Sequence, residues 1–134
     1  WELSAKDRGM TFRHLANMVS GYALNERPGE SWGYNDFAIQ LYAQSLEKLF
    51  GDSLDSAFRQ RMDAIQFEDG EIFGSRNGTG VTASSRDFAR LGWLWLNQGK
   101  WKETQVLDRQ LIDACFRVGV PIGTPRAVSH TDDY

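Results

Sequence analysis

A tyrosine between a loop and a helix is the residue of this chain best placed for chemistry. Tyr34 follows Gly33 and precedes Asn35 and Asp36, at the end of a segment with Pro, Gly, Ser and Asn residues. A phenol at such a junction can hold its hydroxyl in a cleft near the N–H groups of a helix terminus. Its pKa is about 10, so it acts as a base only where a cation stabilises the phenolate. No cation is close in sequence, and from the residues alone we interpret Tyr34 as a buried anchor of the loop.

Two further sets of residues have nucleophilic side chains near bases. Ser45 and Lys48 have the S-x-x-K spacing of a nucleophile with a lysine one helical turn away. That chemistry needs the serine at a buried helix N-terminus. This pair falls late in a predicted helix, so we interpret both as solvated helix residues. Ser129, His130 and Asp132 include the residue types of a catalytic triad, but residues this close in sequence point in different directions and cannot form a relay.

Metal and phosphate sites are not expected. The two histidines, His14 and His130, are far apart in sequence, and Asp132 and Asp133 lack the spacing of a calcium loop. The glycine-rich residues 74–80 lack the lysine of a phosphate-binding P-loop. The sequence therefore predicts no cofactor and no metal, and it favours a tight turn at residues 74–80.

Composition excludes several classes of protein. The 134 residues carry 15 basic and 18 acidic side chains, for a net charge of −3, and the basic residues are scattered. This pattern indicates neither a nucleic-acid groove nor a polybasic membrane anchor. No window approaches the roughly 18 apolar residues of a membrane span. Cys115 is the single cysteine, so no disulfide can form within the chain.

The elements that must position these residues are mainly helices. Loop residues are expected at 22–35, irregular chain with one or two short strands at 66–83, and a turn with a short extended piece at 101–107. The sequence thus predicts a mostly α-helical chain with short β segments. Apolar spacing, N-cap residues (Thr11, Asn35 or Asp36, Ser53, Ser84, Asp108) and stop glycines (Gly21, Gly51, Gly99) predict helices at about 12–20, 36–50, 54–65, 85–98 and 109–117.

The helix at 85–98 has the clearest apolar face. Phe88, Leu91 and Trp95 are predicted to share its buried side, and Trp93 and Leu96 widen that side. For the helix at 54–65, the predicted inward residues are Leu54, Phe58, Met62 and Ile65.

Three stretches, in this order, resemble one enzyme family. Residues 11–22 (TFRHLANMVSGY) are similar to T-x-R-H-L-L-x-H-x-S-G-L, and residues 28–36 (PGESWGYND) to P-G-x-x-F-x-Y-S-N. Residues 80–90 (GVTASSRDFAR) are similar to G-L-x-S-T-A-R-D-L-A-R, and a Leu-Asn-Gln-Gly run follows. Together, over residues 5–107, they resemble the class C branch of the serine beta-lactamases, with the related D-alanyl-D-alanine carboxypeptidases (penicillin-binding proteins) and esterases.

The resemblance implies a fold and a place for two site residues. That α+β fold, shared with the transpeptidases, joins an antiparallel sheet flanked by helices to a helical domain, and residues 1–134 would be a partial domain from its helical part. Tyr34 would inherit the family tyrosine that moves protons to and from the nucleophilic serine and the leaving group. Asp36 stands where the family has an asparagine that contacts the substrate amide and the catalytic lysine. A cation from the nucleophile helix would lower the pKa of Tyr34.

The departures from the family pattern shape the functional expectation. The nucleophilic S-x-x-K should precede Thr11 by many tens of residues, and neither it nor a K-T-G or H-x-G strand motif is found. We therefore expect an internal fragment, inactive alone, of a periplasmic or extracellular bacterial serine hydrolase that forms an acyl-enzyme. Its substrate would be a beta-lactam, a D-Ala-D-Ala peptide or a small ester, and its partner the remainder of its own polypeptide. Such a fragment is expected to expose a large apolar patch or to self-associate.

Two alternatives to the enzyme stay open. The first is a non-catalytic member of the same fold that binds peptide or peptidoglycan without turnover, which Asp36 favours. The second is a helical interaction module unrelated to the family, with Trp93, Trp95 and Trp101 as its partner surface.

Overall fold

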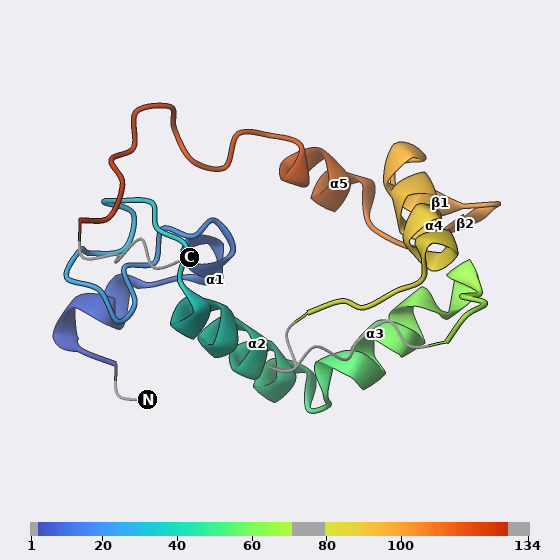
Figure 1. Cartoon of the computed structure of the whole chain (residues 1–134), viewed down its shortest axis with the longest axis horizontal. Coiled ribbons are helices and arrows are strands. Elements are labelled where there is room, and N and C mark those ends of the chain that lie inside the picture. The colour runs from blue at the N-terminus through green and yellow to red at the C-terminus, as the bar shows by residue number, and fades with distance from the viewer. Residues whose placement is uncertain (1–2, 71–79, 129–134) are drawn as a thin grey trace. The chain divides into compact units, whose positions relative to one another are not determined.

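The computed structural model describes residues 3–70 and 80–128 of the chain. These residues are predominantly helical with one short antiparallel sheet, which confirms the predicted fold class at that level. In the sheet, Lys100 lies opposite Gln105. The elements, in chain order (Figure 1), are the 3₁₀-helix η1 (Ala5–Gly9), α1 (Phe12–Ala16), α2 (Asp36–Phe50), α3 (Leu54–Met62), the 3₁₀-helix η2 (Asp63–Ile65), α4 (Ser85–Leu96), β1 (Lys100–Trp101), β2 (Thr104–Gln105) and α5 (Arg109–Cys115).

Some of the sequence predictions fall on residues that are not described. The apolar pair Ile72 and Phe73 and most of the turn at 74–80 lie outside the described residues. The same holds for Ser129, His130 and Asp132.

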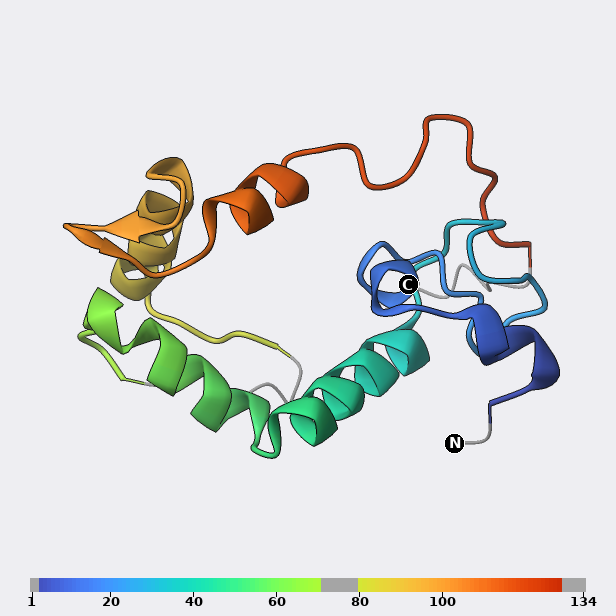
Figure 2. The same ribbon diagram turned by 180° about the vertical axis from the view of Figure 1, so that it is seen from behind.

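The chain divides into two compact units, each with its own core. The first unit holds residues 1–45 and 119–134, and the second holds residues 46–118. In the second unit, β1 packs against α4, and both views place the hairpin beside that helix (Figure 1, Figure 2). The buried core residues are Leu15, Tyr22 and Ala38 in the first unit, and Met62, Ile65 and Leu94 in the second.

Local capping starts the helices as the sequence predicts. The side chains of Thr11, Ser53, Ser84 and Asp108 each accept a backbone N–H from the first turn of the helix that follows. For α2 the sequence left Asn35 and Asp36 as alternatives. The structure selects Asn35, whose Oδ1 accepts the N–H of Ala38 at 3.1 Å.

The predicted end of α1 was wrong by a full turn. The helix stops at Ala16 rather than near Gly21, because Met18 adopts the left-handed conformation with φ of 58°. The N–H of Val19 then donates to the carbonyl of His14 at 3.0 Å, and the N–H of Met18 donates to the carbonyl of Leu15 at 3.1 Å. This pair of bonds satisfies the last helical carbonyls, and it works with a methionine where glycine is usual.

Gly99 was predicted to end α4, but the left-handed position at the end of this helix belongs to the residue before it. Gln98 takes the left-handed cap position with φ of 54°, and its N–H bonds to the carbonyl of Trp95 at 3.1 Å. A Cβ at Gly99 would lie 2.3 Å from the carbonyl oxygen of Leu107. Glycine is therefore needed here for the close approach of the chain after β2.

The predicted buried face of α4 was also wrong in part. Leu94 and Asp87 are fully buried, and Leu91 packs against the same core. By contrast Phe88 is 63% exposed, and Trp95 is only half-buried, against Phe116 with ring centroids 6.0 Å apart. Apolar residues such as Trp93 and Leu96 also lie outside the packed side of α4, so the apolar spacing did not distinguish the side that packs. In α3 and η2 the predicted Met62 and Ile65 are buried, as expected.

Candidate functional site

Backbone hydrogen bonds from two distant segments hold the loop that carries Tyr34. On one side, the N–H of Gly33 bonds to the carbonyl of Met18 at 3.0 Å. On the other side, Trp32 forms an isolated parallel bridge with Arg126. The N–H of Trp32 donates to the carbonyl of Pro125 at 2.8 Å, and the N–H of Ala127 donates to the carbonyl of Trp32 at 2.7 Å. The guanidinium of Arg126 also lies 6.0 Å from the centre of the Trp32 ring. The residues just before Tyr34 are thus fixed on both sides.

Asn35 joins this loop to the first turn of α2. Its amide nitrogen donates to the carbonyl of Tyr22, and its carbonyl oxygen caps the helix through Ala38. The Asn35 side chain is buried, so a substitution there would remove two buried hydrogen bonds. Asn35 is a positioning residue that we did not single out from the sequence beyond its capping propensity.

Tyr34 is not the buried anchor that its sequence context indicated. Its side chain is 43% exposed, at the junction between the fixed loop and α2. Its phenol hydrogen-bonds to the carboxylate of Asp36, two residues on. This hydrogen bond, then burial and the negative charge of Asp36, raise the pKa of Tyr34 above its ordinary value of 10.0.

The raised pKa determines what this pair can do. A phenol that donates a hydrogen bond to a carboxylate is held in its protonated form, so at neutral pH Tyr34 is a hydrogen-bond donor and a weaker acid than a free phenol. The cation that the family resemblance implied would act in the opposite direction. Each cause of the pKa shift that comes from the described residues raises the pKa, so within this part of the chain Tyr34 is not prepared as a base.

A buried serine lies three residues before Tyr34. Ser31 is 5% exposed, and its hydroxyl has no hydrogen-bond partner among the described residues. Buried hydroxyls are rarely left unpaired because desolvation without a bond is costly. No spacing signal in the sequence distinguished Ser31 from the other loop serines.

The third family-like stretch has a structural role. The carboxylate of Asp87 accepts the backbone N–H groups of Glu68 and Asp69, both at 2.9 Å. Arg90 donates to the carbonyls of Ile65 and Gln66, both at 2.9 Å. These bonds attach the segment after η2 to α4, and the backbone bond from Glu68 is the main reason why the pKa of Asp87 is lowered.

Ser45 and Lys48 do not form a catalytic pair. Lys48 is exposed, whereas Ser45 is half-buried and lines an apolar pocket. The interpretation of Ser45 as a solvated helix residue was therefore incomplete. Ser45 also follows Tyr34 along the chain, opposite to the family order.

A metal site and a membrane-spanning helix were sought in residues 3–70 and 80–128. Within them, no group of three or more His, Cys, Asp or Glu residues could hold a metal ion. Nor does any helix there have the length and apolar character needed to cross a membrane.

No protein-family model matches the chain, and no curated protein matches it in sequence. A functional assignment therefore depends on the motif order and on the geometry of Tyr34, Asn35 and Asp36.

Proposed function

We propose that this chain is the helical part of a serine hydrolase of the beta-lactamase and penicillin-binding protein kind, which works through an acyl-enzyme. The observation that carries the proposal is the accessible phenol of Tyr34, fixed at the start of α2 within the motif 28–36. The proposed substrates are a beta-lactam, a D-Ala-D-Ala peptide or a small ester. The proposed location is periplasmic or extracellular.

In this proposal Tyr34 is the general acid. Acyl transfer requires a proton for the leaving group, and a neutral phenol held at a cleft can supply it. The phenolate that results would face the Asp36 carboxylate, an unfavourable pairing of like charges that favours rapid return of a proton from solvent or from another group. The base that activates the nucleophile must then be a different residue. We assign it, with the serine itself, to an S-x-x-K segment outside these residues.

Exposed apolar side chains in the second unit support the proposal of a larger fold. In α4, Phe88, Trp93 and Leu96 are 63%, 58% and 78% exposed, and in α5 Leu111 is 50% exposed. Phe116, just after α5, is 72% exposed. Large apolar surface of this kind normally packs against another part of a protein. The proposed partner is the remainder of the same polypeptide.

A second candidate function is binding without turnover. The observation in its favour is Asp36, which places a negative charge beside Tyr34 where the family has an amide donor. A binder needs no proton transfer, and the raised pKa keeps the phenol of Tyr34 protonated. The interaction module has weaker support, because Trp101 packs against the second core although Trp93 is exposed.

Covalent labelling separates these functions. The 134-residue chain is incubated with a reactive penicillin and, separately, with a fluorophosphonate, and its intact mass is measured. We expect no adduct, because the nucleophile lies outside the chain. A stoichiometric adduct on this chain would contradict the proposal, with Ser45→Ala identifying the first suspect.

The decisive arm uses the longer polypeptide with its upstream S-x-x-K segment. There we expect one adduct per molecule, which disappears when that serine is replaced by alanine. If the segment is present and no adduct forms, while a peptide ending in D-Ala-D-Ala still binds, the chain belongs to a binding protein.

A further inference from the structure

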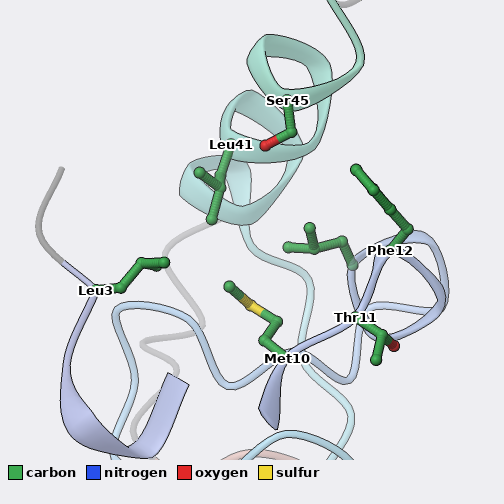
Figure 3. Close-up of a pocket in the computed structure, with 7 residues that line it drawn as sticks. Leu3, Met10, Thr11, Phe12, Leu41 and Ser45 are labelled. Atoms are coloured by element: carbon green, nitrogen blue, oxygen red, sulfur yellow. The ribbon is translucent and has the colours of Figure 1, made fainter. Parts of the chain in front are cut away.

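The first unit contains an apolar pocket that the proposed function does not use. Its volume is about 390 Å³, within the range of small-molecule sites. None of its lining residues carries a charge: they are Leu3, Met10, Thr11, Phe12, Leu15, Leu41 and Ser45 (Figure 3). Neither Tyr34 nor Asn35 nor Asp36 is among the residues that line it. The pocket is thus separate from the Tyr34 site.

The walls of the pocket are mainly hydrocarbon and are held in place by packing. Leu15 belongs to the buried core of this unit, and Met10 and Leu41 pack against that core. Phe12 contacts Tyr42, with ring centroids 5.9 Å apart. Leu3 and Phe12 are 57% and 46% exposed, so the pocket opens to solvent on their side. A ligand can therefore enter without unfolding the core.

Two hydroxyls line this hydrocarbon surface, and they differ in availability. Thr11 Oγ1 accepts the backbone N–H of His14 at 3.3 Å as the cap of α1. Ser45 has no hydrogen-bond partner for its hydroxyl within the described part of the chain, and its side chain is part of the pocket lining, on the same helix as Leu41 (Figure 3). A hydroxyl in an apolar wall is both donor and acceptor, so it selects a ligand with one oxygen at that point.

We propose that this pocket binds a neutral aliphatic molecule that carries one oxygen group, such as an alcohol or the acyl part of an ester. The hydrocarbon would pack against Met10, Phe12 and Leu41, and the oxygen would bond to Ser45 Oγ. A charged group would be excluded, because no lining side chain could pair with it and burying it unpaired is costly.

The test is a titration of the 134-residue chain with 1-octanol, followed by amide chemical shifts in NMR spectra. We expect saturable shifts centred on Met10, Phe12, Leu41 and Ser45, with a Kd below about 1 mM. Ser45→Ala removes one neutral hydrogen bond and should weaken binding about threefold to tenfold. An unchanged Kd in Ser45→Ala would overturn the role of the hydroxyl.

A matched pair of variants on α2 tests the location. Leu41→Trp fills the pocket and should weaken binding at least about tenfold, whereas Leu49→Trp adds the same group at a position that is 67% exposed and outside the lining. Equal effects from the two variants would overturn the proposal. So would shifts in wild type that never saturate, or that centre on the exposed apolar residues of α4. If Leu41→Trp fails to fold, the Ser45→Ala result still decides.

Discussion

At the scale of single residues, the chemistry of the candidate site depends on Asp36. An asparagine at that position would remove the carboxylate charge beside Tyr34, whereas the aspartate accepts a hydrogen bond from the phenol and disfavours the phenolate. One side-chain atom type therefore separates a tyrosine whose phenol stays protonated from one that is easier to ionise.

Replacing Asp36 by asparagine is expected to lower the pKa of Tyr34 toward about 10, because the hydrogen bond to the carboxylate and its charge are both removed. The measurement is a pH titration by NMR with ¹³Cζ-labelled tyrosine, and Tyr34→Phe assigns the resonance. Asp113→Asn, an exposed carboxylate in the second unit, is the control and should leave the titration unchanged. A Tyr34 pKa that does not fall in Asp36→Asn would contradict the assignment of the shift to this carboxylate.

The same shift has a consequence for stability. The folded pKa of Tyr34 is raised, so its contribution to stability is fully present below the unfolded pKa of about 10 and is lost as pH rises through the folded value. Thermal unfolding should therefore show a decline at alkaline pH that is smaller in Asp36→Asn and in Tyr34→Phe than in wild type.

Two neighbouring loop positions should respond in opposite directions to exchange of glycine and alanine. Ala23 is exposed and left-handed with φ of 56°, so Ala23→Gly relieves strain and should stabilise by about 0.5–1 kcal/mol. Gly21 is also left-handed, but a Cβ there would lie 2.1 Å from the carbonyl oxygen of Glu26. Gly21→Ala should therefore destabilise by at least about 1–2 kcal/mol. Urea denaturation measures the change in the free energy of unfolding for both variants. Changes of the same sign would contradict the prediction and show that the loop backbone adjusts to the substitution.

At the scale of elements, α4 organises the second unit through one buried leucine and one buried carboxylate. Leu94 belongs to the core with Met62 and Ile65, and Asp87 holds the segment after η2 by its backbone N–H groups. Phe88, Trp93 and Leu96 of the same helix are exposed to solvent, although the apolar spacing predicted that Phe88 is buried.

Leu94 and Leu96 form a matched pair on α4. Leu94 is fully buried, so Leu94→Ala leaves a cavity and should destabilise by about 2–5 kcal/mol. Leu96 is 78% exposed, and Leu96→Ala should change stability by less than about 0.5 kcal/mol. Chemical denaturation followed by circular dichroism distinguishes them. Equal losses would mean that the packed face of α4 is not the one described.

Asp87 should make the second unit sensitive to acid. Its folded pKa is lowered, mainly by the backbone bond from Glu68, so the stability it contributes is present above the unfolded value of 3.8 and is lost as pH falls through the folded pKa. Asp87→Asn should lower the melting temperature by several degrees at neutral pH and flatten its dependence on acid pH. Glu103→Gln, whose native side chain is 96% exposed, serves as the control. A variant whose acid dependence matches that of wild type would contradict the bonding role of Asp87.

At the scale of the whole molecule, the main feature is apolar surface without cover. The exposed residues Phe88, Trp93 and Leu96 of α4, and Phe116 after α5, are large side chains of the kind that proteins usually bury. The proposed remainder of the polypeptide would cover them, and in its absence copies of the chain can meet through them.

The isolated chain is therefore expected to self-associate. Sedimentation velocity should give an average mass that rises above 15.2 kDa as concentration increases. The double variant Phe88→Ser and Leu96→Ser, at exposed positions, should shift association to higher concentration without loss of helicity. A monodisperse monomer over the whole range would argue against both the exposed surface and the proposed larger fold.

The features that the sequence determined by itself are those that depend on residues close together along the chain. The starts of α1, α3, α4 and α5 were predictable from Thr11, Ser53, Ser84 and Asp108, because an N-cap bond joins residues two or three positions apart. The predominantly helical class was predictable for the same reason, since helical hydrogen bonds and apolar spacing are local.

What only the tertiary structure decided depends on residues far apart in the chain. Leu94 is buried because it packs against Met62 and Ile65. The carboxylate of Asp87 accepts a hydrogen bond from the N–H of Glu68, which lies 19 residues earlier in the chain. In the same way the loop just before Tyr34 is held by backbone bonds to Met18 and Pro125, which lie far from it in the chain. Periodicity gives candidates for a buried face, but burial is a property of the partner that covers it, and that partner is chosen only when the chain folds.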